Sequence, residues 1–137
     1  MKYSFTIGLV LIAICASSIW CNETLKSSSA TLQFDKKVIH CDTLDEGIPH
    51  LFVFPFTNTG SDTLVICNVK TSCGCLVAQW PKKPILPGAR DSIKAIYSTL
   101  MRPGPFTKSI TVKSNDSADP TQFLYCKGYT RSKISER

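Results

Sequence analysis

The feature that most constrains the fold is a run of alternating aromatic residues, in which Phe52, Phe54 and Phe56 occupy every second position. Successive side chains of a β-strand point to opposite faces, so this spacing places three rings on one face. Turn-forming residues follow at 58–62, and a second run rich in β-branched residues covers 63–69. We therefore expect the two runs to pair as an antiparallel hairpin whose aromatic face packs in a core.

The rest of the chain after residue 29 also reads as short extended runs separated by turns, with no amphipathic helix. The further strands that we expect are 30–34, 37–41, 76–80, 93–98, 106–114 and 122–129. Pro55 has no N–H to donate, so its position should face an edge or a bulge. The predicted core side chains are Phe52, Phe54, Phe56, Leu64, Ile66, Ile96, Ile110, Val112 and Leu124. This pattern predicts an all-β antiparallel sandwich of about seven strands.

Several short motifs of this chain resemble those of one known family. They are F-x-F-T-N-T-G, L-V-I-x-x-V, S-C-G-C, L-P-G, Y-S-T and G-x-F-x-K-x-I-x-V-x-S-N-D, and the resemblance extends over about Ala30 to Tyr129. They are similar to the bacterial envelope family catalogued as domain of unknown function 1573, whose domains resemble the immunoglobulin-like domains of the cilium and centrosome proteins ASPM, SPD-2 and Hydin. The resemblance implies an exported immunoglobulin-like (Ig-like) β-sandwich, and such modules without a catalytic motif usually bind or scaffold other proteins.

The N-terminus has the pattern of a signal peptide, because Lys2 precedes the apolar run Ile7 to Ile14 and small residues follow it. We expect a signal peptide over 1–20, a flexible polar segment over 21–29, one domain over 30–130 and a basic tail over 131–137. Cys21 is a candidate for lipidation, which would tether the domain to a membrane, although Trp20 is not the small residue preferred before such a cysteine. The predicted location is the bacterial envelope, in the periplasm or at the outer membrane.

The formal net charge is +6, but the basic residues are dispersed in separate pairs such as Lys36-Lys37 and Lys82-Lys83. No nucleic-acid motif accompanies them, so we expect a solvated surface and no nucleic-acid partner. The expected partner is an envelope protein. It could pair with an exposed sheet edge, either at residues 30–34 or at the strand that contains Pro55.

The cysteines are the one place in the sequence that suggests chemistry. Cys73 and Cys75 are two residues apart, so in an extended segment they point to the same side. Four alternatives remain open: a mutual disulfide that exchanges with thiols, a soft-metal site for copper or zinc, a structural disulfide to another cysteine, or reduced packing residues. The candidates for additional ligands or disulfide partners are Cys41, Cys67, Cys126 and His50.

These observations predict a protein that is not an enzyme and needs no cofactor. The sequence contains no glycine-rich phosphate loop, no paired-carboxylate motif and no recognisable setting for His40 or His50 as a general base. The favoured function is an exported interaction or scaffolding module of the cell envelope. The alternative, from a different class, is a thiol-redox or soft-metal binding protein that uses Cys73 and Cys75.

Overall fold

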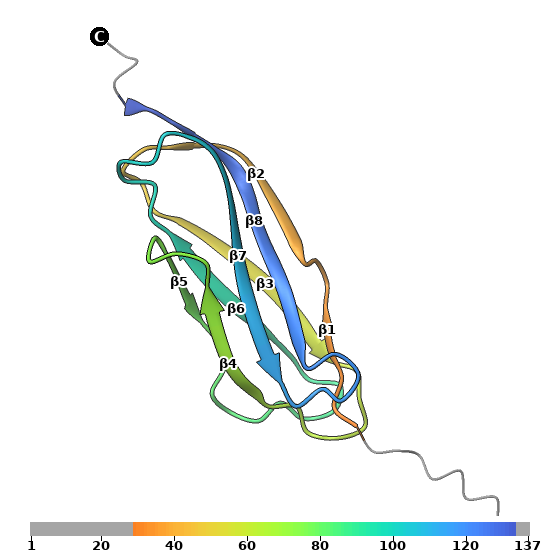
Figure 1. Cartoon of the computed structure of the whole chain (residues 1–137). Helices are drawn as coiled ribbons and strands as arrows, with labels where there is room; N and C mark the ends of the chain where they lie inside the picture. The colour runs from red at the N-terminus through yellow and green to blue at the C-terminus, as the bar shows by residue number, and fades with distance from the viewer. Residues whose placement is uncertain (1–28, 134–137) are drawn as a thin grey trace, which may run out of the picture.

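The computed structural model describes residues 29–133, which form two β-sheets packed face to face (Figure 1). Sheet A contains, in order across the sheet, β1 (Leu32–Phe34), β3 (His50–Asn58), β6 (Arg90–Tyr97) and β5 (Leu76–Gln79). Sheet B contains β2 (Val38–Asp45), β8 (Thr121–Arg131), β7 (Gly104–Ser114) and β4 (Ile66–Thr71). The predicted all-β sandwich is confirmed, with eight strands in the described residues rather than about seven.

The first extended part of the domain is divided between the two sheets. β1 pairs antiparallel with β3 in sheet A, whereas β2 runs parallel to β8 in sheet B. The predicted sandwich was wholly antiparallel, so this parallel pair is a correction. The register of β2 on β8 shifts between His40 and Thr43, which lets the strand continue to Asp45.

The predicted hairpin between the aromatic run and residues 63–69 is wrong. β3 pairs with β1 and β6, whereas β4 pairs with β7, so the two runs lie in different sheets. The turn residues at 58–62 carry the chain across the sandwich instead of reversing it within one sheet. At this point the backbone N–H of Asn58 donates to the carbonyl of Ala89 (3.0 Å), and its carbonyl accepts from the N–H of Gly88 (2.7 Å).

The side chain of Asn58 fixes this crossing, because it is fully buried and has four hydrogen-bond partners. Its Oδ1 accepts from the backbone N–H groups of Gly60 (3.1 Å) and Thr31 (3.3 Å). Its Nδ2 donates to the carbonyls of Asp62 (2.8 Å) and Ile85 (3.0 Å). The amide thus joins the start of β1, the turn after β3 and the segment before β6.

Eight of the nine predicted core side chains are buried, and the prediction of Ile96 is wrong. The three aromatic residues of β3 have 1% exposure or less, as the alternating pattern required. In β6 it is Ile93, Ala95 and Tyr97 that face the core, so Ile96 lies on the opposite face and is 39% exposed. The ring of Tyr97 packs on that of Phe106 from sheet B, with 4.5 Å between ring centroids.

Pro55 lies in β3, which has a neighbour on both sides, and it has no N–H to donate toward β1. The carbonyl of Pro55 accepts from the N–H of Asp35 (3.1 Å), so the backbone polar groups of Pro55 face β1. Because β1 ends at Phe34, the proline stands just beyond the paired part of that strand. The proline therefore faces the end of an edge strand, where one unmade backbone bond is tolerated.

The outward side of β1 is covered by side chains from sheet B and its adjoining loop. The N–H of Leu32 donates to Oδ2 of Asp116 (2.8 Å), and the carbonyl of Leu32 accepts from Nε2 of Gln122 (2.9 Å). Oδ1 of Asp116 also accepts from the N–H groups of Ala118 (2.9 Å) and Asp119 (3.2 Å). Burial alone would raise the pKa of Asp116, but these N–H donors and the nearby charge of Lys37 outweigh it and lower the pKa below 3.8.

We expect Asp116→Asn to lower the free energy of unfolding by about 2 kcal/mol at pH 7, because one acceptor oxygen becomes an amide that faces an N–H donor. A carboxyl with a lowered folded-state pKa stabilises the fold above its unfolded pKa of about 4 and loses this contribution as the pH falls through the folded value. The difference between the two proteins in urea unfolding should therefore shrink below pH 4. The exposed Asp119→Asn is the control, and an offset that stays constant with pH would contradict the assignment.

The predicted signal peptide, Cys21 and most of the predicted polar segment and basic tail lie outside the described residues. β8 continues to Arg131, so the first residue of the predicted tail belongs to a strand. Within residues 29–133, no helical segment has the length and apolar character that crossing a membrane requires.

Candidate functional site

The segment Cys73-Gly74-Cys75 connects β4 of sheet B to β5 of sheet A. The two sulfur atoms form a disulfide, with 5.2 Å between the Cα atoms. The structure thus has the mutual disulfide among the four alternatives, and the other described cysteines, Cys41, Cys67 and Cys126, are free thiols. Nothing lies within 4 Å of the position where a side chain at Gly74 would begin, so this small loop meets open space.

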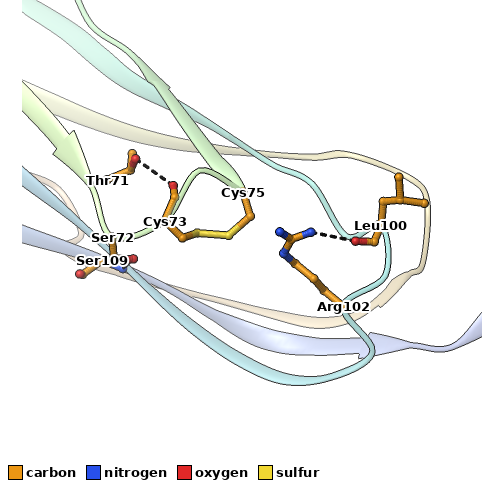
Figure 2. Close-up of a disulfide and its surroundings, with 7 residues drawn as sticks. All are labelled: Thr71, Ser72, Cys73, Cys75, Leu100, Arg102 and Ser109. Carbon is orange, nitrogen blue, oxygen red and sulfur yellow. Dashed lines mark hydrogen bonds between the residues drawn. A yellow bond between two sulfur atoms is a disulfide. The ribbon is translucent and has the colours of Figure 1, made fainter.

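Hydrogen bonds on both sides of the disulfide hold the loop in place, and Figure 2 shows the surrounding residues. The Thr71 hydroxyl donates to the carbonyl of Cys73 (3.2 Å), and the N–H of Ser98 donates to the carbonyl of Cys75 (2.8 Å). Ser72 binds Ser109 of β7 through its N–H (2.9 Å) and through its hydroxyl, which accepts from the Ser109 N–H (3.1 Å). The crossing from sheet B to sheet A is therefore fixed at each strand that it leaves or joins.

A second loop, 98–103, lies at the same end of the sandwich (Figure 2). Thr99 is buried, and its hydroxyl lies within hydrogen-bond distance of the carbonyls of Asp45 (3.0 Å) and Ile48 (2.9 Å). Nη1 of Arg102 donates to the carbonyl of Leu100 (2.8 Å). Met101 has a positive φ of 55° and is 83% exposed, so this loop directs an apolar side chain into water.

The structure does not bring the other candidate ligands to the disulfide as a metal site. His50 begins β3 and packs its ring against Phe52, with 4.7 Å between centroids. Cys67 is exposed in β4. Among residues 29–133, no three His, Cys, Asp or Glu side chains form a group that could hold a metal ion.

Cys41 and Cys126 lie near each other in sheet B, in β2 and β8. Burial raises the pKa of the fully buried Cys126 to about 12, with a smaller contribution from Cys41. Burial also raises the pKa of Cys41, whose thiol donates to the carbonyl of Lys127 (3.4 Å). Because the thiolate is the reactive form, these two cysteines have the character of packing residues.

The outer face of sheet A carries a row of exposed aliphatic side chains next to the disulfide loop. Leu51 of β3 lies opposite Ile96 of β6, which in turn lies opposite Val77 of β5. Their exposed fractions are 51%, 39% and 57%. We call these three residues the apolar row, and it begins two residues after Cys75.

More exposed apolar side chains adjoin the apolar row. Val53 is the next outward residue of β3, and Ile48, Leu100 and Met101 lie in the loops that precede β3 and follow β6. The neighbouring outward position of β6 is Lys94, opposite Val53. The end of sheet A that bears the disulfide therefore combines an apolar surface with a cation.

Sequence reasoning missed this surface. The alternation in 93–98 has aliphatic residues on both faces, and Ile96 was predicted to be in the core. One signal in the sequence could have indicated an exposed apolar surface. When a sheet packs on one side only, the two faces of a strand cannot both be buried, so one of the two aliphatic faces of residues 93–98 had to be exposed. Val77 and Leu51 join Ile96 only through pairings between strands distant in sequence.

Comparisons with known proteins agree with this architecture. A family model described as a protein of unknown function (DUF1573) matches residues 32–130. Among curated proteins, none matches the chain.

Several solved structures have a similar fold at low sequence identity. A protein of unknown function from Porphyromonas gingivalis W83 is 15% identical, with a TM-score of 0.66, over 76% of this chain and 48% of that one. PapD-like domain 7 of human CEP192 is 10% identical, with a TM-score of 0.63, over 78% and 89%. The Escherichia coli chaperone DraB is 10% identical, with a TM-score of 0.52, over 76% and 56%. The chain spans about half the length of the Porphyromonas protein, and these likenesses establish an Ig-like, PapD-like fold.

Proposed function

The chain belongs to the DUF1573 family of proteins of unknown function, and from its fold and surface we propose that it is an exported, non-enzymatic interaction module of the bacterial cell envelope. In this proposal it binds another envelope protein through the end of sheet A that carries the disulfide.

The observation that carries the proposal is the apolar row with the exposed side chains around it. Leu51, Ile96 and Val77 are contiguous across three strands, and each leaves a large part of an aliphatic side chain in water. Scattered exposed apolar residues are normal, but a contiguous apolar patch edged by polar groups is typical of a protein-binding surface. Burying such side chains contributes about 25 cal/mol for each Å² removed from water.

Edge pairing was the mode expected from the sequence, but β3, the strand that contains Pro55, is not an edge, and three of the four sheet edges support binding less well than this face. The edge of β1 is occupied by the side chains of Asp116 and Gln122. β5 has four residues and is followed closely by Pro81, and β4 carries Lys70, two features that discourage strand addition. We therefore propose that the partner packs on the face of sheet A.

Export is supported by the signal-peptide pattern of the sequence together with the Cys73–Cys75 disulfide, because disulfides persist in oxidising compartments. We infer the absence of turnover from the sequence, in which neither His40 nor His50 lies in a recognisable catalytic motif.

Site-specific photo-crosslinking in the native bacterium tests the proposal. A photoreactive amino acid at Ile96 or Val77 should give a discrete protein adduct in the envelope fraction, because both side chains lie on the proposed contact surface. The matched control is Ser117, which is exposed in the loop between β7 and β8 and should give none. Glutamate at position 77 should abolish the adduct from position 96, because an interfacial carboxylate would lose its water. Equal adducts from positions 96 and 117 would refute the assigned surface.

The same experiment separates this function from thiol exchange. Replacing both Cys73 and Cys75 by serine should leave the adduct from position 96 in place if the disulfide only supports the loop. If the adduct requires both cysteines and disappears on reduction, it is a mixed disulfide, and the interaction module is the wrong function.

A further inference from the structure

We propose that the outer face of sheet B binds an anionic polysaccharide along a row of aromatic side chains on β8. The row consists of Phe123, Tyr125 and Tyr129 and is called the aromatic row below. This site lies on the sheet opposite the proposed protein-binding surface. It rests on the proposed function only for its location in the envelope.

The aromatic row arises from the alternation of β8. Leu124 and Cys126 are fully buried, so the side chains between and beside them point outward. Phe123 is 50% exposed and Tyr129 is 49% exposed, and Tyr125 is half-buried between them. From Phe123 to Tyr129 the row spans roughly 20 Å, at about 3.3 Å for each residue of a strand.

A row of hydroxyl groups runs beside the aromatic row on β7. Thr111 lies opposite Phe123, Ser109 opposite Tyr125, and Thr107 opposite Lys127. The structure gives the side-chain hydroxyls of these three β7 residues no protein partner within the described part of the chain. They are therefore open to donate to, and accept from, a ligand that lies along β7.

The part of this face formed by β4, β7 and β8 carries positive charge. Lys127 lies within the aromatic row, Lys113 lies opposite Thr121 at one end of it, and Lys70 of β4 lies opposite Thr111. The outward positions of β4, β7 and β8 include no carboxylate, whereas β2, the other neighbour of β8, carries the exposed Asp42 and Asp45, and Asp45 pairs with Arg131. A ligand with regularly spaced negative charges would thus meet lysines on both sides of the hydroxyl row.

These three features together match the chemistry of an acidic sugar chain. One face of a sugar ring presents mainly C–H groups that pack on aromatic rings, its hydroxyls pair with serine and threonine, and uronate carboxylates pair with lysine. Single-stranded nucleic acid also stacks on aromatic residues above lysines. We favour the polysaccharide because a row of hydroxyls suits a hydroxyl-rich chain and because the proposed envelope location supplies acidic glycans.

NMR titration of the full mature chain with oligogalacturonate long enough to span the row tests the proposal. Saturable shifts should be confined to the amides of β7 and β8, and affinity should fall as sodium chloride rises from roughly 50 to 500 mM. Phe123→Ala and Tyr129→Ala should each weaken binding by about tenfold or more, equivalent to about 1.4 kcal/mol. Leu51→Ala, which removes a similarly exposed side chain from sheet A, is the control and should not change it.

Two matched ligands test whether the negative charge of the ligand is needed and whether the site prefers a polysaccharide to a nucleic acid. The methyl ester of the same oligosaccharide, which has the same chain without the charge, should bind at least tenfold more weakly. Equal binding of the ester, equal or tighter binding of oligothymidylate, or no saturable binding of oligogalacturonate would each overturn the proposal. So would unchanged binding by the two aromatic variants. None of these outcomes bears on sheet A, so failure here is distinct from failure of the protein-binding function.

Discussion

Replacing Asn58 by alanine should lower the free energy of unfolding by about 4 kcal/mol, the largest effect that we expect for a polar side chain of this protein. The amide is fully buried and satisfies two N–H groups and two carbonyls of the backbone. Each buried group left without a partner costs about 1–3 kcal/mol, and three of the four bonds are only partly buried, so the sum stays below four full penalties. The lost hydrogen bonds lie where the chain crosses from one sheet to the other. The midpoint of the cooperative unfolding transition of the whole domain should therefore shift to a lower urea concentration.

Urea unfolding followed by circular dichroism measures this effect, and Asn115→Ala is the matched control. Asn115 also makes two side-chain bonds to backbone, accepting from the N–H of Val65 (2.8 Å) and donating to the carbonyl of Thr63 (3.0 Å), but it is exposed. Water replaces those bonds, so the control should lose no more than about 1 kcal/mol. If both variants lose the same amount, the burial of Asn58 is not what makes it important.

Asn58 also shows which part of the fold could not be predicted from the sequence. Asn, Gly, Ser and Asp at 58–62 were correctly read as a turn, because these residues favour turn conformations. Whether such a turn closes a hairpin or sends the chain to another sheet depends on its distant partners. Here Thr31 and Ile85 are each 27 residues from Asn58. No local pattern encodes those contacts.

The buried face of a strand could be predicted where one face carries clearly larger apolar side chains than the other. This condition holds for β3, with Phe52, Phe54 and Phe56 inside and the smaller Leu51 and Val53 outside, and the prediction was correct there. It fails for β6, where Ile96 and Ile93 lie on opposite faces and only packing against sheet B selects Ile93. In β8 the predicted burial of Leu124 is confirmed, and the aromatic residues lie on the opposite, outward face of the strand.

The sequence showed that Cys73 and Cys75 form a motif, but it did not show which cysteine each of them pairs with. Spacing placed Cys73 and Cys75 on the same side, which permits their mutual bond but also permits pairing with any cysteine brought near. The fold resolves this, because Cys67 is exposed on β4 and Cys41 and Cys126 lie together between β2 and β8. The apolar row next to the loop depends on the register of β3, β6 and β5, which the sequence does not state.

Gly60→Ala should lower the free energy of unfolding by about 3 kcal/mol, although Gly60 has no positive φ and alanine is otherwise compatible with its backbone. A Cβ at this position would meet backbone atoms alone: the carbonyl oxygen of Ser29, the nitrogen of Thr31 at 2.6 Å and the carbonyl carbon of Ala30 at 2.8 Å. Backbone atoms cannot rotate away as a side chain does, so the segment that leads into β1 must move.

The change should therefore be larger near β1 than elsewhere, which distinguishes it from the global effect of Asn58→Ala. The N–H groups of Thr59 and Ser61 donate to Thr31 and Ser29 (3.1 and 3.0 Å), so their hydrogen exchange should accelerate more than that of the amides between β3 and β6. Gly74→Ala is the control, because nothing lies within 4 Å of its added Cβ, and its stability should change by less than about 0.5 kcal/mol. If Gly60→Ala lowers the free energy of unfolding as little as Gly74→Ala does, the segment before β1 can move away from the added methyl group at no energetic cost. The contact between β1 and the turn after β3 would then not be needed to hold β1 on the sandwich.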